Sequence, residues 1–349
     1  MRSGLGARPW TGLDIGSYSV KLLSLQGAGG GRHAIAELPL RRPLNGEEPP
    51  AAEMARLLGE CLSSAGQSAR GLHGVTLGVS GPDVIVKQIS LPLMDEGEVA
   101  GALRFEARKH LPFDPQTMVI DFQVLGRYPG EKRLDVLLAA VSQQRLERAL
   151  APLRELGIEA DIVDAAPLAL TNALAWIATA DGEARVLLDL GHAGSWLTLW
   201  QRGAPYFTRR LEWGGLAVTQ AIAAAARVPL EEAEEWKLEA GSDAPSMRVR
   251  PDAPEMQAVR ATVAHLADEI RRSFAFYRTL GPLPDPLTLW LSGNTARLPG
   301  IAGQLSEALG APVLVFNPLD AAGADGGDGP RPAGGPQFAQ AFGLALRAR

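Results

Sequence analysis

A chain of 349 residues with 46% hydrophobic and 21% charged residues has the composition of a folded protein and is long enough for two or more lobes. Its formal net charge is −5 at pH 7, which argues against non-specific nucleic-acid binding as the main activity. A single cysteine, Cys61, excludes an internal disulfide and fits a reducing compartment. No apolar run reaches the ~20 residues of a membrane-spanning helix, and no secretion signal follows Arg2. We therefore expect a cytoplasmic protein that reaches a membrane only through a partner.

A tight β-hairpin is predicted near the start of the chain. Residues 10–16 read as an apolar strand that ends in Asp14-x-Gly16, and residues 17–25 as a second strand with alternating apolar positions. Strands and helices then alternate from residue 75 to residue 164. We expect a strand over 84–91 that ends at Pro92, a helix over 96–111 that ends at Pro112, a buried strand over 135–140 and a helix over 143–157. This block is predicted to be a small α/β unit of its own.

The first hairpin recurs near the middle of the chain. Residues 185–191 read as a strand that ends in Asp189-x-Gly191, and residues 192–200 repeat the alternating second strand, at an offset of 175 residues. Duplication of a hairpin at half the chain length indicates duplicated lobes that face each other.

Helices dominate the predicted second half. They are expected at 216–227, at 230–240 and, as a long amphipathic helix, at 254–279. A strand over 287–291 leads into Ser292-Gly293-Asn294 and a helix over 301–309. Residues 320–336 are rich in Gly, Pro, Ala and Asp and predict a flexible loop, followed by a final helix over 338–347.

The two hairpin turns carry residue types that bind phosphate. Gly16 and Gly191 let backbone N–H groups approach a phosphate without a side chain in the way. Asp14 and Asp189 are suited to hold a hydrated Mg²⁺ or to orient a water molecule. Additional hydroxyl donors are Ser17, Ser19 and Ser195. The alternative is a pair of ordinary β-hairpins in which Asp and Gly supply only turn chemistry; the paired occurrence favours a clamp on one nucleotide.

Weaker signals lie in the second half. Gly293 stands between a predicted buried strand and a helix, where it lets the backbone pack against an adenine or ribose. Glu234 and Lys237 lie three apart on one helix face, with a solvated helix face as the alternative. The sequence has no P-loop and no Gly-x-Ser-x-Gly, and its five scattered histidines and one cysteine form no metal-binding cluster.

These residues carry a resemblance to a known family. The segment Asp14-Ile-Gly-Ser-Tyr-Ser-Val-Lys21 resembles the first phosphate motif of the superfamily of actin, sugar kinases and heat-shock chaperones. The segments at 106–114, 120–125, 136–142, 207–210, 233–237, 298–301 and 342–347 are similar, in collinear order, to the PilM family of type IV pilus assembly proteins. Among these segments, Leu-Pro-Phe-Asp114 and Asp-Phe-Gln-Val124 are the most specific to the PilM family.

The resemblance implies a fold and a domain organisation. It is the α/β actin-like ATPase fold, with two ribonuclease-H-like lobes and an inserted subdomain like that of the division protein FtsA. The first lobe would comprise residues 1–81, 161–184 and 318–349, and the inserted subdomain residues 82–160. The second lobe would comprise residues 185–215 and 281–317, with a helical subdomain at 216–280.

The resemblance also implies a cofactor, ATP with Mg²⁺, and a set of site residues. The first phosphate motif maps to Asp14, Gly16, Ser17, Ser19 and Lys21, the second to Asp189, Gly191 and Ser195, and the adenosine side to Gly215, Glu234, Lys237, Gly293 and Asn294. Asp14 and Asp189 would be the catalytic and Mg²⁺-holding pair. Departures from the family pattern are bulky His192 and Trp196 in the second motif, Asn294 in place of a second glycine, and Ala165 in place of an acidic residue. They favour nucleotide binding over turnover.

The implied role is a cytoplasmic, ATP-binding scaffold at the inner face of the inner membrane. Such a scaffold binds the N-terminal cytoplasmic peptide of PilN and connects the PilN/PilO complex with the pilus motor ATPases. Three alternatives stay open: a small-molecule kinase on the same fold, a nucleotide-free adaptor similar to GspL of type II secretion, and a division role like that of FtsA. The sequence does not decide whether ATP is hydrolysed.

Overall fold

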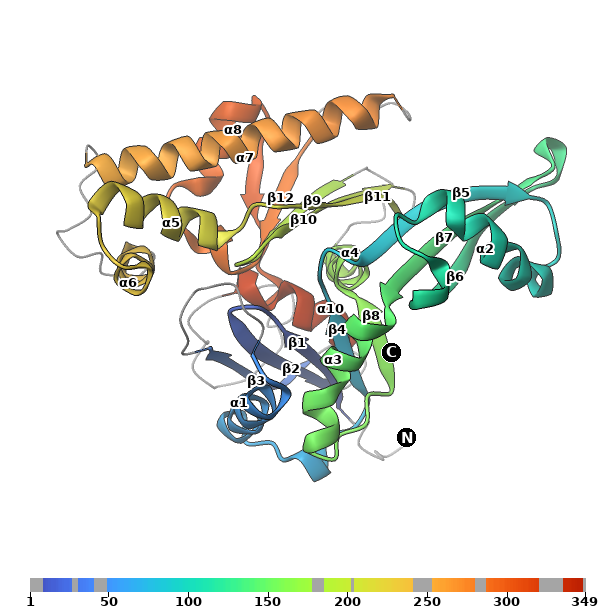
Figure 1. Ribbon diagram of the computed structural model, residues 1–349, viewed down its shortest axis with the longest axis horizontal. Helices are drawn as coiled ribbons and strands as arrows, with labels where there is room; N and C mark the ends of the chain where they lie inside the picture. Colours follow the sequence, from blue (N-terminus) through green and yellow to red (C-terminus); the bar gives the residue numbers. More distant parts are fainter. Residues whose placement is uncertain are drawn as a thin grey trace, which may run out of the picture.

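The computed structural model describes residues 9–26, 31–40, 49–177, 185–201, 204–240, 253–279, 287–319 and 335–347. Within these residues, two mixed sheets and a smaller antiparallel sheet form the framework of the molecule (Figure 1). The greater part of the loop predicted over 320–336 lies outside the described residues. No helix among the described residues is long and apolar enough to cross a membrane.

The first sheet contains the N-terminal hairpin. Its strands are β1 (Trp10–Ile15), β2 (Ser19–Gln26), β3 (Gly31–Pro39), β4 (Val75–Val79) and β8 (Ile162–Ala165), in the order β3-β2-β1-β4-β8. The first three strands are antiparallel, whereas β4 and β8 run parallel to β1. Helix α1 (Ala51–Ser64) covers one face and buries Leu58 and Cys61 against Leu13 and Leu22 of the sheet. Cys61 is thus a packing residue.

The second sheet repeats the first. Its strands are β9 (Arg185–Leu190), β10 (Ser195–Gln201), β11 (Ala204–Leu211), β12 (Leu289–Ser292) and β13 (Val313–Val315), in the order β11-β10-β9-β12-β13 with the same strand directions. Even the irregularity recurs: the β2–β3 register shifts between Ser24 and Leu25, and the β10–β11 register between Leu199 and Trp200. The half-length repeat predicted from the sequence is confirmed.

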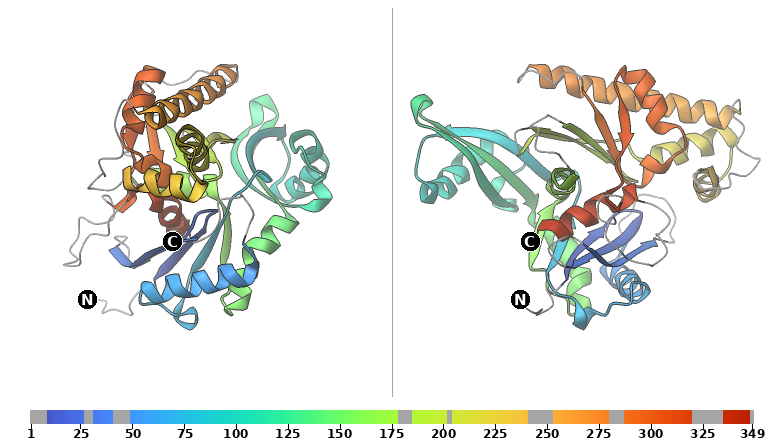
Figure 2. Two further views of the ribbon diagram at one scale, coloured as in Figure 1. Left: turned by 60° about the vertical axis from the view of Figure 1, so that its left-hand side comes forward. Right: turned by 180° about the vertical axis from the view of Figure 1, so that it is seen from behind.

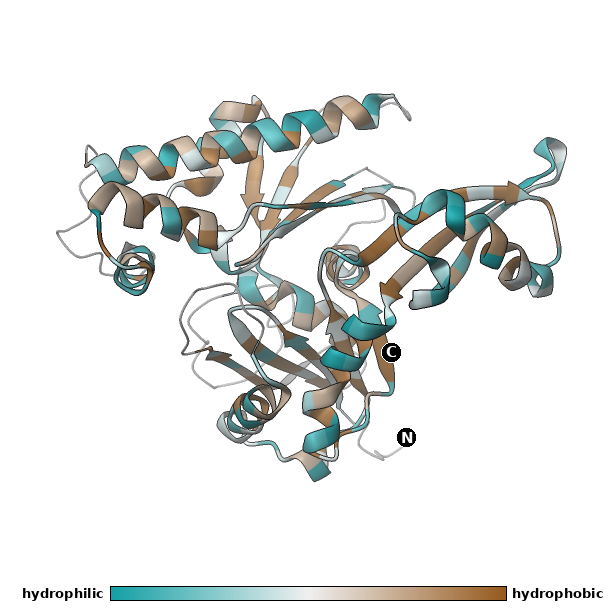
Figure 3. Ribbon diagram, in the orientation of Figure 1, coloured by the Kyte–Doolittle hydropathy of each residue, from teal (hydrophilic) through white to brown (hydrophobic). Residues whose placement is uncertain are grey.

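Helices cover the outer face of the second sheet. They are α5 (Gly215–Ala226), α7 (Pro254–Arg278) and α8 (Ile301–Leu309), and α6 (Leu230–Ala240) packs against α5; all four are close to the predicted bounds. Val259, Val263, Leu266 and Ile270 form the buried stripe of α7, because residues three and four apart share one helix face. Figure 3 shows hydrophilic positions alternating with this stripe along the helix.

The inserted unit has its own sheet and core. Strands β5 (Val84–Pro92), β7 (Arg133–Ser142) and β6 (Met118–Tyr128) pair in that order, and α2 (Glu96–His110) packs on them through Val99 and Leu103. Helix α3 (Gln143–Glu155) follows, and its Leu153 joins the core of the first lobe. Short 3₁₀ helices lie at η1 (Ala69–Gly71), η2 (Pro115–Thr117) and η3 (Pro129–Glu131).

Two helices lie between the large sheets, α4 (Ala166–Ile177) and α10 (Ala339–Arg347), the latter preceded by η5 (Pro336–Phe338) (Figure 2). Their apolar side chains form an interlobe core with Leu23 of β2 and Trp196 of β10. Gly12 of β1 and Gly343 of α10 allow this close packing, because a Cβ at Gly12 would overlap the Ala341 carbonyl oxygen and one at Gly343 that of Ala169. Tight backbone contact therefore holds the first sheet against α10 and α10 against α4, and side chains such as Trp196 complete the packing to the second sheet.

Candidate functional site

A cleft of about 740 Å³ lies between the lobes and is lined by both hairpin turns. The sequence-predicted residues that line it are Asp14, Gly16, Ser17, Ser19, Lys21, Asp189, Gly191, Gly293 and Asn294. They come from β1 and β2 on one side, and from β9, β12 and η4 (Asn294–Arg297) on the other. Gly16 and Gly191, 175 residues apart in sequence, thus face the same space.

Asp14 and Lys21 form a buried ion pair at the floor of the cleft. They are direct partners in the β1–β2 register, and Lys21 Nζ lies 3.2 Å from Asp14 Oδ2. Gln340 of α10 donates from Nε2 to Asp14 Oδ1 at 3.0 Å. Burial by itself lowers the pKa of Lys21, but the charges of Asp14 and Glu37 outweigh it and raise that pKa above its ordinary value. Lys21 therefore keeps its positive charge inside the cleft.

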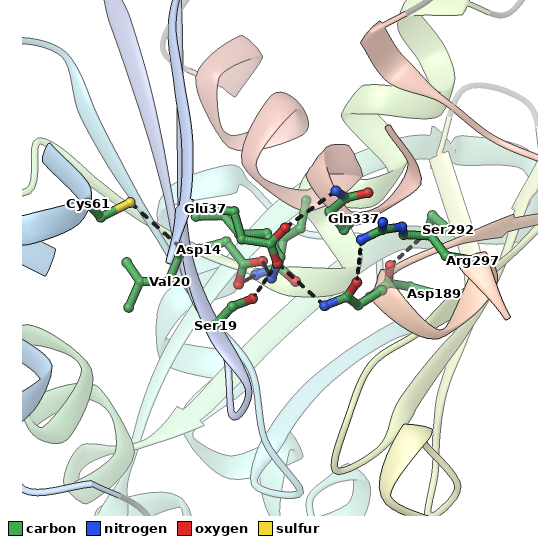
Figure 4. Close-up of polar contacts among 12 residues, drawn as sticks. Asp14, Ser19, Val20, Glu37, Cys61, Asp189, Ser292, Arg297 and Gln337 are labelled. Atoms are coloured by element: carbon green, nitrogen blue, oxygen red, sulfur yellow. Dashed lines mark hydrogen bonds and ion pairs between the residues drawn. The ribbon is translucent and has the colours of Figure 1, made fainter. Parts of the chain in front are cut away.

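Asp189 lies on the opposing lobe, partly exposed to the cleft. Ser292 Oγ donates to its Oδ1 at 2.7 Å (Figure 4). Burial raises the pKa of Asp189 to about 6, and the negative charge of Asp14 adds to that rise. A cation between the two carboxylates would relieve this repulsion. The donor set fits Mg²⁺, which binds proteins through one or two carboxylates and keeps most of its water; no group of three or more His, Cys, Asp or Glu suited to a metal occurs in the described residues.

The glycines are required first of all by the turns themselves. Gly16 N donates to Ser19 O at 3.0 Å, so this amide is already used inside the turn. A Cβ at Gly191 would lie 2.5 Å from Gly194 O, and one at Gly16 3.2 Å from Ser19 O. The backbone amides that remain to face a ligand are those of the residues between the two ends of each turn. Ser195 is not brought into the cleft: it is fully buried, and its Oγ donates to Trp213 O at 2.6 Å.

A second pocket of about 70 Å³ adjoins the cleft on the side of α6. Glu234 and Lys237 line it, and Lys237 Nζ lies 2.6 Å from Glu234 Oε2. Lys237 also donates to Gly215 O at 3.1 Å. Burial lowers the pKa of Lys237 and Glu234 opposes this shift. Because Glu234 is buried, the alternative of a solvated helix face is wrong for this pair.

Tyr18 and His192 separate the second pocket from the main cleft and line both. Tyr18 comes from the first turn and His192 from the second, and their ring centroids are 5.0 Å apart. Burial and the adjacent Lys237 lower the pKa of His192 to about 4, so its imidazole is neutral at pH 7. Burial and a hydrogen bond with Glu234 raise the pKa of the Tyr18 hydroxyl. Bulky His192, unusual for such a motif, thus contacts the opposite lobe.

Sequence reasoning missed Glu37 of β3. Its carboxylate accepts from Ser19 Oγ at 2.8 Å, from Asn294 Nδ2 at 3.4 Å and from Gln337 Nε2 at 3.4 Å, and so connects the lobes (Figure 4). The apolar alternation around Glu37 was a usable strand signal, but only the β2–β3 register places it opposite Lys21. Gln337 and Gln340 had no local signal.

Comparison with known proteins identifies the family of this chain. The family described as type IV pilus assembly protein PilM matches residues 12–349. The chain belongs to the PilM family. Among solved structures, a PilM–PilN type IV pilus biogenesis complex matches with a TM-score of 0.82 and 28% identity, over 97% of this chain and 98% of that one.

More distant structures share the fold alone. The ethanolamine utilization protein EutJ from Carboxydothermus hydrogenoformans has a TM-score of 0.58 and 16% identity, over 97% of this chain and 89% of that one. Component A of the (R)-2-hydroxyglutaryl-CoA dehydratase of Acidaminococcus fermentans has a TM-score of 0.50 and 14% identity, over 97% of each chain. The predicted PilM membership and the actin-like ATPase fold are confirmed, and the chain is a PilM-like type IV pilus biogenesis protein.

Proposed function

We propose that this PilM-family protein binds Mg²⁺-ATP between its lobes and presents the resulting conformation to the N-terminal cytoplasmic peptide of a PilN-like membrane protein. The observation that carries the nucleotide half is the convergence of the duplicated Asp-x-Gly turns on one cleft of about 740 Å³. That volume falls within the range of about 300–1,000 Å³ typical of small-molecule sites.

In the phosphate half, Asp14 and Asp189 would hold the hydrated Mg²⁺ between them, and the ion would supply positive charge to the phosphates. Burial, and after it the charge of Asp14, raises the pKa of Asp189 to about 6, and a cation between the two carboxylates would offset both effects. Lys21 remains charged and holds Asp14 in place from the neighbouring strand. Backbone amides of the turn residues Ser17 and Ala193 are proposed as phosphate donors.

In the adenosine half, we propose that Gly293, Asn294, Glu234 and Lys237 contact the nucleoside, beside Gly215. Asn294, Glu234 and Lys237 border a pocket of about 70 Å³, which is too small for a nucleoside while Tyr18 lies in it. Nucleotide binding therefore has to move the Tyr18 ring away from His192 and Glu234. A change in this interlobe contact links occupancy of the site to the relative position of the lobes.

Equilibrium binding of Mg²⁺-ATP tests the nucleotide half. Asp14→Asn and Asp189→Asn are expected to weaken binding about 10- to 100-fold, the usual effect of losing a charged contact. Asp121→Asn on the exposed edge of β6 is the matched control, because its carboxylate accepts only a local bond from Phe122 N at 2.8 Å among the described residues. Unchanged affinity in both cleft variants would remove the site assignment.

The partner half is supported by the PilM–PilN complex, which resembles this chain over nearly the whole length of both. We place the peptide in the arm of the cleft that runs between α1 and α3, lined by Pro50, Met54, Arg148 and Pro152. Ser80 and the first hairpin turn line the same cleft, so a peptide bound there would sense the state of the nucleotide site. Through PilN and its partner PilO, the protein would connect the inner-membrane complex with the pilus motor.

Fluorescence anisotropy with a labelled N-terminal peptide of the PilN-like protein, with and without Mg²⁺-ATP, tests the partner half. Binding is expected to tighten when nucleotide is present. Arg148→Glu is expected to weaken it about 10-fold or more. Arg154→Glu on the same helix is the control, because Arg154 pairs with Glu147 outside the cleft. Equal peptide affinity in Arg148→Glu and wild type would move the groove elsewhere.

A further inference from the structure

The site residues predicted from the sequence include no cation that is placed to bind the end of a triphosphate chain. Lys21 is held by Asp14 at 3.2 Å at the floor of the cleft. Lys237 lies in the second pocket, hereafter the adenosine pocket, and pairs with Glu234. Asp14 and Asp189 are themselves acidic, so a Mg²⁺ ion held between them would be offset in part by their own negative charge. A further cationic side chain is needed where the terminal phosphate lies.

Arg210 of β11 is directed to that place by strand alternation. It is the cross-strand partner of Trp196 on β10, and such partners project from the same face of a sheet. Trp196 lies in the interlobe core, so this is the cleft face, and Arg210 lines the cleft. Its neighbour Arg209 faces the other way and contacts Ser273 and Glu269 of α7.

The Arg210 guanidinium lies directly on the second phosphate turn. A Cβ at Gly194 would overlap its Nη2, and Nη2 donates to Ala193 O at 3.5 Å. A larger residue at position 194 would displace the guanidinium, so glycine there leaves room for Arg210 in its present position. His192, earlier in the same turn, lines both the adenosine pocket and the cleft, whereas Gly194 and Arg210 line only the cleft. The turn thus runs from the adenosine side towards Arg210, at the far end of the phosphate path.

The ion pair that Arg210 forms with Glu212 is weak, so its loss costs little. Arg210 pairs with Glu212, whose side chain is 75% exposed, while the side chain of Arg210 is only 16% exposed. An ion pair with an exposed partner contributes little, because water screens it. A phosphate can instead accept two parallel N–H bonds from one guanidinium, which is a stronger and more directional interaction.

We propose that Arg210 binds the terminal phosphate of the nucleotide and so makes the site selective for nucleoside triphosphate over diphosphate. This inference rests on the proposed function of the cleft. It adds an arginine from β11 to the residues that the duplicated turns supply.

Calorimetric titration of the full-length protein with Mg²⁺-ATP, Mg²⁺-ADP and inorganic tripolyphosphate tests the proposal. Arg210→Ala is expected to weaken ATP and tripolyphosphate binding about 10- to 100-fold and ADP binding less than about 3-fold. Arg210→Lys is expected to recover only part of the ATP affinity, because an ammonium group cannot form the paired bonds. Arg209→Ala, on the opposite face of the same strand, is expected to leave all three affinities unchanged.

An equal loss for ATP and ADP, or no loss for either, overturns the role of Arg210 while leaving nucleotide binding intact. If wild type binds tripolyphosphate through Arg210 but does not bind ATP, Arg210 binds polyphosphate only, and both the selectivity for nucleoside triphosphate and the adenosine assignment are overturned. If wild type binds none of the three ligands, the proposed function and this inference both fail.

Discussion

Replacing Asp189 by asparagine is expected to stabilise the folded protein while it weakens Mg²⁺-ATP binding. The pKa of Asp189 rises from 3.8 to about 6 on folding, chiefly through burial and then through Asp14. Each pKa unit corresponds to about 1.4 kcal/mol, so the charged carboxylate costs at most about 3 kcal/mol. Solvent in the cleft screens part of this, which leaves an expected gain of about 1–2 kcal/mol for Asp189→Asn.

The gain depends on pH in a defined direction. Because the folded pKa of about 6 lies above the unfolded value of 3.8, the penalty is absent below the unfolded value and complete above about pH 6. Thermal unfolding without ligand should therefore show a higher midpoint for Asp189→Asn than for wild type at pH 7.5. The two midpoints should converge as the pH falls towards 4. Addition of Mg²⁺-ATP should stabilise wild type more than the variant.

Asp164→Asn is the matched control for this experiment. Burial also raises the pKa of Asp164 to about 6, although Arg347 opposes the rise, and Asp164 does not line the cleft. It should stabilise the apoprotein with the same pH dependence and leave ATP affinity unchanged. An apoprotein midpoint for Asp189→Asn at or below that of wild type at pH 7.5 would refute the claim that the cleft holds an electrostatically unfavourable carboxylate.

Three further outcomes follow from named contacts. Gly343→Ala should lower the unfolding midpoint by the equivalent of about 1–3 kcal/mol, because its Cβ meets the Ala169 backbone. Gly303→Ala on α8, which has open space around it, should not lower the midpoint; a lower midpoint in both variants would point to a general helix effect. Tyr18→Ala should accelerate the association of Mg²⁺-ATP in stopped-flow measurements, because the Tyr18 ring no longer has to move. Tyr128→Ala on the inserted unit should leave the association rate unchanged. An unaltered rate in Tyr18→Ala would contradict the proposal that this ring moves on binding. His192, followed by NMR, should titrate near pH 4, and a midpoint near 6.5 would show that the ring is solvated.

Much of the fold was readable because it is local. The hairpins around Gly16 and Gly191, the helices of the inserted unit and the stripe of α7 are each recognisable from a single local segment, through alternation or helical periodicity. The repeat needed only a comparison of the chain with itself. Strand β3 was not predicted, although its residues alternate and the glycine-rich residues 27–31 before it are a turn signal.

The candidate site was readable in part. Most of the predicted residues line the cleft or the adjoining pocket. Gly215 lines neither of them, and Ser195 is buried in the lobe, where its Oγ donates to Trp213 O. Glu37, Gln340 and Arg210 were not found, because each acquires its place from a sheet register or from a helix distant in sequence.

By itself, the sequence determined the two Asp-x-Gly turns, their duplication and membership of the PilM family. Only the tertiary structure decided which polar atoms of those turns remain for a ligand. Gln340 reaches Asp14 across 326 residues, and Gly16 N is used within its own turn. A local pattern fixes which donors, acceptors and charges a segment contains. Packing of the whole chain fixes which of them are already satisfied, because most buried polar groups form hydrogen bonds with partners that only folding brings near.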